Sequence, residues 1–381
     1  MHTLYLTPDR RGEHITETFA GAGVKVISRS GLHPVEAVLM DQVNSLRRPG
    51  RLLVVGNRTA GVALAAAALH EGCRPLVHTT DHHHLKAALR NVSANRADDR
   101  VEAVCESVIG RAGEFDAALV QLCEGDQPGE LIQEWIDEVR AAVKPGGRVI
   151  VAAERPKPWL LKQLKEAFGA GPTPVGGGLV RITGSSRGPD PHPKSRESAF
   201  TMSLPGGART VELVTIPGVF SHRRVDEGAQ ALAETLEARP GDRMLDLGCG
   251  SGAVGIVTAC NTPLAGVTFV DGSARAVECA RANALRNGLV PPLTGFVLSD
   301  DGLSGPPRFT LFAGNPPYFS QHQIDELFIQ TARRMLLPGG RAYFVAKNTG
   351  WIEPRVREVF GNGELRMRRG YGIVLAVQAD P

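Results

Sequence analysis

The sequence lacks the features that mark membrane-spanning, secreted or metal-binding chains. Its most apolar run, residues 61–69, is too short to cross a bilayer, and the polar residues 1–13 give no sign of a secretory signal. The six cysteines are scattered without a CxxC pair, so we expect reduced thiols in a cytoplasmic protein. The adjacent residues His82, His83 and His84 would face different sides of a helix, so we expect no metal site.

An excess of charge of one sign is also missing. The chain has 43 Lys and Arg residues against 40 Asp and Glu residues, a net charge of +3, which excludes a general binder of polyanions. Only local clusters of Lys and Arg side chains could bind the phosphates of a nucleic acid. The arginines near the C-terminus fit either such a cluster or a solvated charged face, and both readings stay open. They are Arg333, Arg334, Arg366, Arg368 and Arg369.

Apolar runs and amphipathic segments alternate through both halves of the chain. Predicted strands cover residues 51–56, 75–79, 101–104, 117–122, 244–247, 267–271, 296–298 and 309–313, and predicted helices cover 61–70, 85–95, 131–143, 274–287 and 324–336. This alternation indicates mostly parallel sheets with helices on both faces. Lys144-Pro-Gly-Gly-Arg148 and Leu337-Pro-Gly-Gly-Arg341, each predicted as a turn entering a strand, occupy matching places. We therefore predict an α/β protein of two tandem Rossmann-like domains that arose by internal duplication.

A stretch rich in Gly, Pro and Ser separates the two halves. Residues 184–198 are predicted to be a linker between a domain of residues 1–183 and a domain of residues 199–381. Just after it, residues 200–204 and 211–215 flank Pro205-Gly-Gly, which predicts a β-hairpin.

An acidic, glycine-rich loop follows the first predicted strand of the second half. Its residues are Asp246, Leu247, Gly248, Cys249, Gly250, Ser251 and Gly252. Glycines here permit a tight turn and let a ligand approach the backbone closely. The GxGxG spacing and the preceding carboxylate favour S-adenosylmethionine, with its cationic amino-acid end, over a dinucleotide. Cys249 is expected to fill space in the loop rather than to act as a nucleophile.

Two more carboxylates follow the next two predicted strands. Asp271 is placed to accept hydrogen bonds from ribose hydroxyls, and Asp300 lies in a polar segment that could reach an adenine amino group. The predicted donor site therefore consists of Asp246, Gly248, Cys249, Gly250, Gly252, Asp271 and Asp300.

The segment Asn315-Pro316-Pro317-Tyr318 follows the predicted strand 309–313 and has the composition of a site for a planar nitrogen. The oxygens of Asn315 and of the Pro316 carbonyl can accept the two N–H bonds of an amino group and aim its lone pair at a methyl sulfonium. The prolines hold these acceptors in place, and Tyr318 can stack on a planar substrate. Such catalysis depends on positioning and electrostatics.

Phe220 precedes the core of the second half. From the residues alone, it could line the mouth of the site or pack the hairpin onto the core. Phe220, Tyr318 and Phe319 are the predicted substrate-binding side chains. In the first half, Val54-Val-Gly56 replaces the acidic glycine loop and Leu122-Cys-Glu-Gly125 is expected where Asn-Pro-Pro-Tyr would fall. We expect that half to be a degenerate methyltransferase-like domain that serves as a scaffold or docks the substrate.

The motifs of the second half, taken together, resemble those of the bacterial ribosomal RNA guanine-N2 methyltransferases of the RsmC and RlmG type. These motifs are Pro217-Gly-Val-Phe-Ser221, Asp226-x-Gly228, the acidic glycine loop and Asn315-Pro-Pro-aromatic. The resemblance covers residues 200–381 and extends to the first half in layout only. It implies S-adenosylmethionine as donor, a ribosomal RNA guanine as acceptor, and ribosomal RNA or a ribosomal subunit as partner. It also implies donor binding and catalysis at the residues above and favours a site role for Phe220.

Asn-Pro-Pro-Tyr is also typical of methyltransferases that act on release-factor glutamine and of some that act on DNA adenine. A protein glutamine or a DNA adenine therefore stays open as the acceptor. A non-catalytic RNA-binding or assembly protein is a third hypothesis. The oligomeric state does not follow from the sequence.

Overall fold

The computed structural model describes residues 4–8, 15–19, 22–28, 31–56, 58–122, 128–169, 171–206, 208–317 and 322–380. The chain divides into two compact units, Met1–Arg196 and Glu197–Pro381. β10 ends at Ser185 and β11 begins at Ser198, and the described segment between them is neither helix nor strand. The predicted linker, residues 184–198, covers this segment.

The first unit begins with a small antiparallel sheet and continues as alternating strands and helices. Its elements are β1 Leu4–Pro8, β2 Ile15–Phe19, β3 Val24–Ser28, α1 Pro34–Gln42, a 3-10 turn Val43–Ser45, β4 Arg51–Val55, α2 Gly61–Leu69, β5 Arg74–Thr79, α3 His82–Ala94, β6 Glu102–Cys105, β7 Phe115–Leu122, α4 Gly129–Ala142, β8 Val143–Glu154, α5 Pro158–Phe168, β9 Pro172–Gly176 and β10 Leu179–Ser185.

The second unit repeats this order after a β-hairpin. Its elements are β11 Ser198–Met202, β12 Val211–Thr215, α6 Glu227–Thr235, β13 Arg243–Leu247, α7 Ala253–Asn261, β14 Gly266–Asp271, α8 Ala274–Arg286, β15 Thr294–Leu298, β16 Phe309–Gly314, α9 Gln323–Met335, β17 Leu336–Ala346, α10 Ile352–Phe360, β18 Glu364–Arg368 and β19 Tyr371–Val377. The pairing of β11 with β12 confirms the predicted hairpin.

Within the described ranges, each unit holds one seven-stranded sheet, and the two sheets have the same strand order. The order is β6-β5-β4-β7-β8-β10-β9 in the first unit and β15-β14-β13-β16-β17-β19-β18 in the second. In each sheet five strands run parallel and the last two pair antiparallel. The predicted fold, two tandem Rossmann-like domains, is confirmed.

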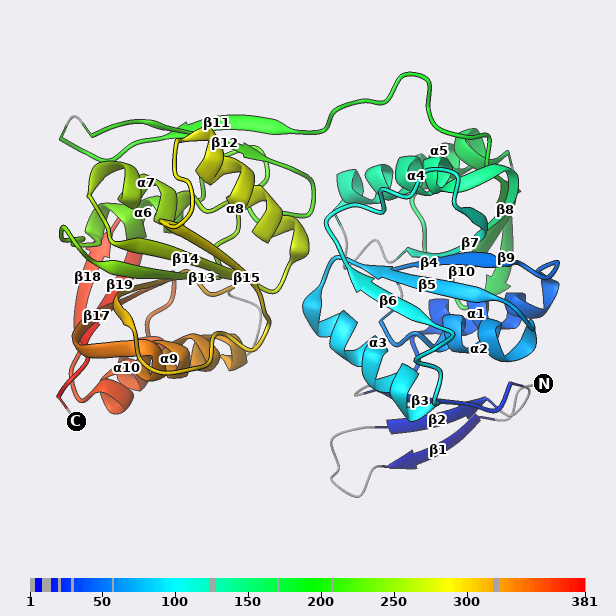
Figure 1. Ribbon diagram of the computed structural model, residues 1–381, viewed down its shortest axis with the longest axis horizontal. Coiled ribbons are helices and arrows are strands. Elements are labelled where there is room, and N and C mark those ends of the chain that lie inside the picture. Colours follow the sequence, from blue (N-terminus) through cyan, green and yellow to red (C-terminus); the bar gives the residue numbers. More distant parts are fainter. Residues whose placement is uncertain are drawn as a thin grey trace. The chain divides into compact units, whose positions relative to one another are not determined.

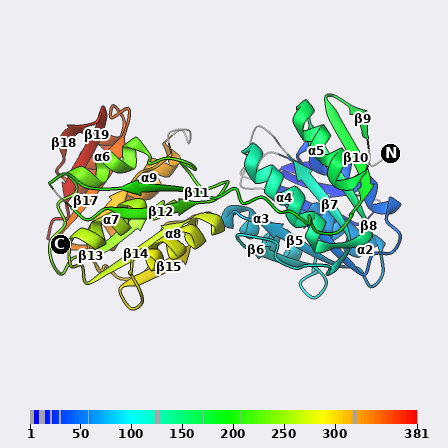
Figure 2. The same cartoon turned by 90° about the horizontal axis from the view of Figure 1, so that it is seen from above.

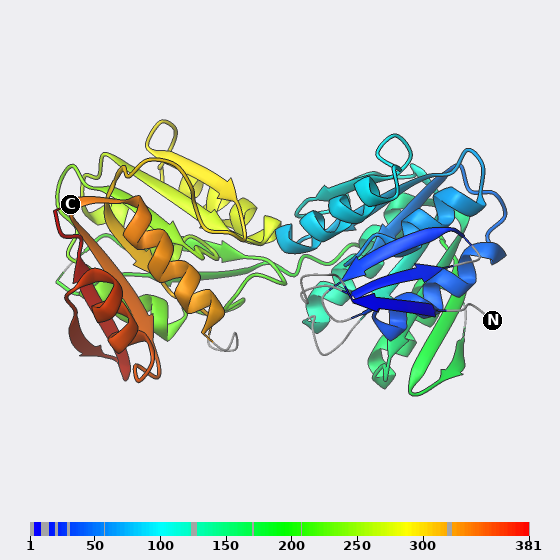
Figure 3. The same cartoon turned by 90° about the horizontal axis from the view of Figure 1, so that it is seen from below.

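Helices cover both faces of each sheet and enclose an apolar layer on each side. In the second unit, α6, α7 and α8 lie on one face, and α9 and α10 lie on the other (Figures 1 and 3). Figure 2 shows the β11–β12 hairpin on the outer side of the layer formed by α6, α7 and α8, next to α8. The two clusters of buried side chains in this unit correspond to these two faces. Strands buried on both faces are continuous apolar runs, which is why the sequence predicts them well.

The Pro-Gly-Gly segments differ from the prediction of a turn followed by a strand. Both lie inside long strands, β8 and β17, at a shift in the pairing register. Phe115 pairs with Val143 and Ala117 with Arg148, and correspondingly Phe309 pairs with Leu336 and Leu311 with Arg341. Gly146 and Gly339 have φ values of 81° and 74°, so glycine lets the chain bulge without leaving the strand.

A pair of asparagines one helical turn apart joins a helix to the outer strand in each unit. Asn283 of α8 accepts a hydrogen bond from Val214 N at 2.8 Å and donates to Val214 O at 2.8 Å, and Asn287 does the same with Glu212 at 3.1 and 2.7 Å. Asn91 of α3 and Asn95, the residue directly after α3, repeat these bonds with Ile27 and Lys25 of β3. The repeat of side-chain bonds supports the duplication independently of the strand order.

No helix within the described ranges combines the length and the hydropathy of a membrane span. Nor do the described residues include a group of three or more His, Cys, Asp or Glu side chains that could hold a metal ion. His82, His83 and His84 form the first turn of α3, whose N-cap Asp81 accepts a hydrogen bond from His84 N.

Candidate active site

The glycine-rich loop of the second unit connects β13 to α7, and hydrogen bonds to the neighbouring strand β14 hold it in place. The backbone N–H groups of Gly248 and Cys249 donate to Val270 O at 2.8 and 3.1 Å. A Cβ atom on Gly248 would lie 2.7 Å from Cζ of Phe328, whereas one on Gly250 would meet no atom within 4 Å. The loop is therefore packed tightly on its inner side and open at Gly250, where a ligand can approach the backbone.

Asp246 lies under this loop as a buried carboxylate. Its side chain accepts a hydrogen bond from Gly255 N at 2.9 Å. Burial, against the lowering effect of the hydrogen bond from Gly255 and with a smaller contribution from the charge of Asp271, raises the pKa of Asp246 to about 7. A cationic ligand group beside it would favour its ionised form, so Asp246 fits the positively charged end of S-adenosylmethionine.

The other two predicted donor-site carboxylates lie at the ends of the next two strands. Asp271, the last residue of β14, accepts from Gly250 N at 3.0 Å and from Ser273 N at 2.9 Å. A Cβ atom on Gly272 would lie 3.4 Å from Cβ of Asp300, so Asp300 is adjacent to this turn. A carboxylate at the end of this strand is placed where it could accept hydrogen bonds from ribose hydroxyls.

Cys249 is buried in the loop at 7% exposure. Burial and then the charges of Asp271 and Asp246 raise the pKa of its thiol well above the usual value. A thiol that resists ionisation is a poor nucleophile, which agrees with the predicted filler role.

Asn315 directly follows β16. It lies beside the glycine-rich loop of residues 248–252, which is called the donor loop below. Leu247, the residue before Gly248, pairs with Gly314, the residue before Asn315. The Asn315 side-chain nitrogen Nδ2 donates to Oδ2 of Asp226 at 2.9 Å. Pro316 is buried and Pro317 half-buried. Tyr318 and Phe319, the other predicted residues of this segment, lie outside the described residues.

The contact with Asp226 was not predicted as part of the site. Asp226 is the N-cap of α6 and accepts from Ala229 N at 2.8 Å with the same oxygen that binds Asn315. The sequence signal for the cap is an Asp directly before an alanine-rich helix. The partner 89 residues away follows only from the fold.

Phe220 extends into solvent from a loop whose preceding residues are anchored. Its exposed fraction is 58%, whereas the preceding Val219 is buried. Arg275 of α8, only 2% exposed, donates from Nε to Pro217 O at 2.7 Å. The ring therefore does not pack the hairpin onto the core, and its role at the mouth of the site stays a prediction.

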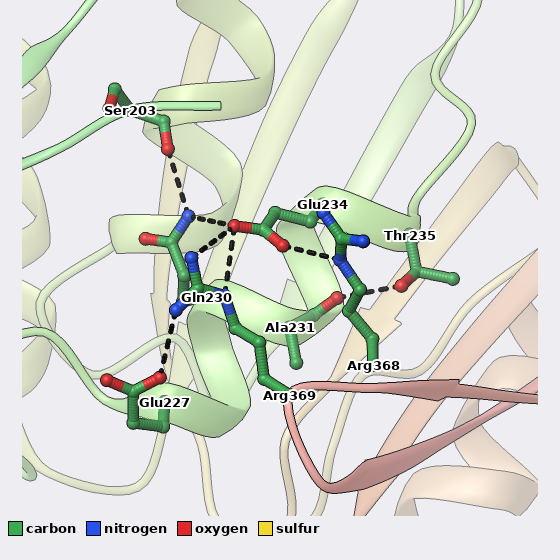
Figure 4. A network of polar contacts seen from close by, with 8 residues as sticks. All are labelled: Ser203, Glu227, Gln230, Ala231, Glu234, Thr235, Arg368 and Arg369. Atoms are coloured by element: carbon green, nitrogen blue, oxygen red, sulfur yellow. Dashed lines mark hydrogen bonds and ion pairs between the residues drawn. The ribbon is translucent and has the colours of Figure 1, made fainter. Parts of the chain in front are cut away.

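Three arginines near the C-terminus pair with glutamates instead of presenting free charge. Figure 4 shows Glu234 of α6 between Arg368 and Arg369, at 2.6 and 2.8 Å. Burial alone would raise the pKa of Glu234, but hydrogen bonds from Arg369, Gln230 and Arg368 outweigh it and hold the pKa at about 2.

Arg366 bonds to Glu237 and Glu364, and Arg334 donates to Leu303 O. These contacts favour a structural role over phosphate binding for the arginines involved.

The strand registers show what the first unit has in place of the site. Val54 occupies the position of Asp246, and Thr79 that of Asp271. Val120 corresponds to Gly314, so Gln121 stands where Asn315 stands. The prediction that Leu122 occupies this position was wrong by one residue, because the segment from β7 to the Pro-Gly-Gly bulge is one residue longer than its counterpart.

Comparisons with known proteins agree with this geometry. Residues 210–375 match the family model "Methyltransferase small domain". The chain is 36% identical over 187 residues to Ribosomal RNA small subunit methyltransferase C of Pseudomonas aeruginosa, covering 48% of this chain and 54% of that protein. It is 33% identical over 185 residues to the protein of the same name from Stutzerimonas stutzeri, covering 47% and 54%. The chain thus spans about half the length of the curated relatives it matches.

One solved structure matches nearly the whole chain, "T. Thermophilus 16S rRNA N2 G1207 methyltransferase (RsmC) in complex with AdoMet and Guanosine". It aligns over 99% of this chain and 98% of that chain with a TM-score of 0.75 and 23% identity, which extends the likeness in fold to the first unit.

Both units have the fold of class I methyltransferases. Residues 210–375 resemble the methyltransferase small domain family, and the chain is similar to proteins named Ribosomal RNA small subunit methyltransferase C.

Proposed function

We propose that this protein transfers a methyl group from S-adenosylmethionine to the exocyclic N2 of a guanine in ribosomal RNA. The observation that carries the proposal is the oriented amide of Asn315 next to the donor loop. Asp226 accepts a hydrogen bond from Nδ2 of Asn315. The other polar atom of the Asn315 side chain, the acceptor Oδ1, therefore points away from Asp226 and can bind an amino group.

The residues of the site act by holding the acceptor nitrogen and the donor in line. Asn315 Oδ1 and the Pro316 carbonyl would accept the two N–H bonds of the guanine amino group, which localises its lone pair on nitrogen. Asp246 would hold the cationic end of the donor and Asp271 its ribose. S-adenosylmethionine, when bound, supplies a methyl group on a sulfonium centre. Positioning of this kind can contribute several kcal/mol to lowering the barrier.

A guanine within RNA has to leave its stack to reach this site, at a cost of a few kcal/mol. We assign the exposed ring of Phe220, with Tyr318 and Phe319, to the substrate side, where aromatic rings can stack on the base. We also propose that residues 199–381 are the catalytic domain, that residues 1–183 dock the ribosomal RNA or subunit, and that the protein acts in the cytoplasm.

Mapping of methylated nucleotides in ribosomal RNA from cells with and without this protein tests the proposal. We expect one guanine to lose its N2 methyl group in cells without the protein and to regain it on complementation. In vitro, purified protein and labelled donor should label ribosomal RNA and leave DNA and release factor unlabelled. Label only in protein or DNA would reject the proposed acceptor. Failure to bind S-adenosylmethionine by calorimetry would instead favour a non-catalytic RNA-binding protein.

A further inference from the structure

The contact between Asn315 and Asp226 joins two segments that are far apart in sequence. One oxygen of Asp226, Oδ2, accepts from Asn315 Nδ2 at 2.9 Å and from Ala229 N at 2.8 Å. The second of these bonds caps α6, so the carboxylate is held by a helix end as well as by its own backbone. Asn315 therefore bonds to a group whose position is fixed by the fold.

A carboxylate is a selective partner for an amide. The oxygen and nitrogen of an asparagine side chain are nearly the same size, so sterics alone do not choose between its two orientations. An ionised carboxylate only accepts hydrogen bonds, so it binds the amide nitrogen and repels the amide oxygen. Turning Asn315 by 180° would place two oxygens together and would direct a donor, rather than an acceptor, toward the substrate.

Helix α6, which begins directly after Asp226, is also fixed by hydrogen bonds and ion pairs further along its length. Gln230 of α6 donates to Ser203 O at 2.9 Å, and Glu234 binds Arg368 and Arg369 of the β18–β19 turn (Figure 4). The side chain of Glu234 is only 2% exposed. These bonds limit sliding and rotation of α6, and so limit movement of its N-cap.

We propose that Asp226 is the positioning residue that selects the catalytically competent orientation of the Asn315 amide. The inference rests on the proposed amino-group methylation, and it adds that Asn315 functions only while Asp226 accepts from its nitrogen. Asp226 has no direct contact with the donor in this role and works through Asn315.

Three substitutions separate this role from helix capping. Asp226→Asn keeps one acceptor oxygen where both hydrogen bonds converge, so we expect kcat within about threefold of wild type. Asp226→Ser keeps a capping hydroxyl but is too short to reach Asn315, so we expect kcat to fall about 100-fold. Asp226→Ala should lose both functions and also lower the melting temperature. The affinity for S-adenosylmethionine should stay within about twofold in the first two variants, because neither change touches the donor loop.

A matched change in the first unit controls for capping alone. Asp81 is the N-cap of α3, the helix that corresponds to α8, and accepts from His84 N at 3.1 Å. Asp81→Ser makes the same chemical change at a helix start without a link to Asn315. It should leave kcat unchanged.

The assay uses whichever acceptor pool the wild-type protein labels, so a wrong acceptor does not stop the test. If the wild type labels ribosomal RNA and Asp226→Ser is as active as Asp226→Asn, the inference about Asp226 is wrong while the proposed function stands. Equal losses in the Asn and Ser variants would also contradict it, because they would show that the charge matters and the orientation does not.

Nuclear magnetic resonance gives a readout independent of activity. The side-chain amide signals of Asn315, assigned by their loss in Asn315→Ala, should show slow proton exchange in the wild type and Asp226→Asn, and fast exchange in Asp226→Ser. Slow exchange that persists in Asp226→Ser would overturn the inference even if no acceptor were labelled.

Discussion

At the scale of single residues, the proposed acceptor site depends on the amide of Asn315. Asn315→Ala removes the acceptor oxygen and leaves the donor loop intact, because the loop is held by Val270 and Phe328 rather than by Asn315. We expect kcat to fall by more than about 100-fold, while the dissociation constant for S-adenosylmethionine stays within about twofold. Stopped-flow or single-turnover methylation together with calorimetry measures the two quantities.

Asn315→Asp serves as the matched variant for this prediction. It keeps the shape and the acceptor oxygens but places a second carboxylate beside Asp226. Repulsion between the two should make it at least as inactive as Asn315→Ala. Normal turnover in either variant would reject the mechanism.

The buried carboxylate of Asp246 predicts a dependence on pH. Burial raises its pKa from the ordinary value of 3.8 to about 7 in the folded, ligand-free protein. Between these two values the unfolded chain loses its proton while the folded protein keeps it, so stability falls as pH rises from about 4 to about 7. The total effect is a few kcal/mol. Differential scanning calorimetry across this range should show a steeper fall for the wild type than for Asp246→Asn, which does not titrate.

The same carboxylate should make donor binding sensitive to pH. Because the cationic end of S-adenosylmethionine favours ionised Asp246, affinity should rise as pH increases from about 5.5 to about 7.5. In Asp246→Asn the affinity should be weaker and nearly flat over this range. A wild-type affinity without this rise would show that Asp246 does not meet the positive charge of the donor.

At the scale of elements, the duplicated asparagines allow the two units to be perturbed in the same way. Asn283 bonds to Val214 and also donates to Ser251 O of the donor loop at 3.0 Å, and Asn91 bonds to Ile27 and to Thr59 O at 3.0 Å. Alanine at either position leaves buried backbone groups without these partners, at a cost of about 1–3 kcal/mol. Both variants should therefore melt at lower temperature.

Of the two variants, only Asn283→Ala should also weaken S-adenosylmethionine binding, because Asn283, unlike Asn91, bonds to the loop that we propose holds the donor. Thermal unfolding and calorimetry on the matched pair make this distinction. An equal loss of donor affinity in Asn91→Ala would mean that the first unit contributes to donor binding.

The elements that the sequence predicted share a physical origin. Central strands such as β4 and β13 are buried on both faces and appear as apolar runs, and helix α8 begins at a capping serine. The hairpins at the edges of the two seven-stranded sheets, β9–β10 and β18–β19, were not predicted. β9, for example, is the exposed run Pro172–Gly176, which has no alternation of apolar and polar residues to mark a strand.

The placement of the candidate site residues follows from local sequence where they stand at strand ends, whereas their tertiary contacts do not follow from it. The glycine loop, Asp271 and Asn315 stand at strand ends, so their meeting at one edge follows from a parallel sheet. The pairing of Asp226 with Asn315, and of Glu234 with Arg368 and Arg369, joins residues with no sequence relation. Charge counting cannot distinguish paired arginines from free ones.

At the scale of the whole molecule, the two units share a fold but carry different residues at the positions of the candidate site. Each unit has its own sheet with an apolar cluster on each face. The first keeps the strand order, the asparagine pair and the bulge. Val54 and Thr79 stand where the second unit has Asp246 and Asp271, the two carboxylates that we propose bind the donor. A unit that retains the fold without the site can serve as a surface for a large substrate.

This division predicts the behaviour of the second unit alone. Residues 197–381, expressed without the first unit, should fold cooperatively, since both of their apolar clusters lie within that range. Their affinity for S-adenosylmethionine should stay within about twofold of the full chain, because every donor-site residue is present. Methylation of ribosomal RNA should lose at least about tenfold in kcat/KM through a higher KM, since the docking surface is missing.

Methylation of a short guanine-containing RNA, too small to span two units, should be equal in both proteins and serves as the control. Equal kcat/KM on ribosomal RNA would remove the docking role from the first unit, whereas loss of activity on the short RNA as well would show that the first unit supports the active site itself.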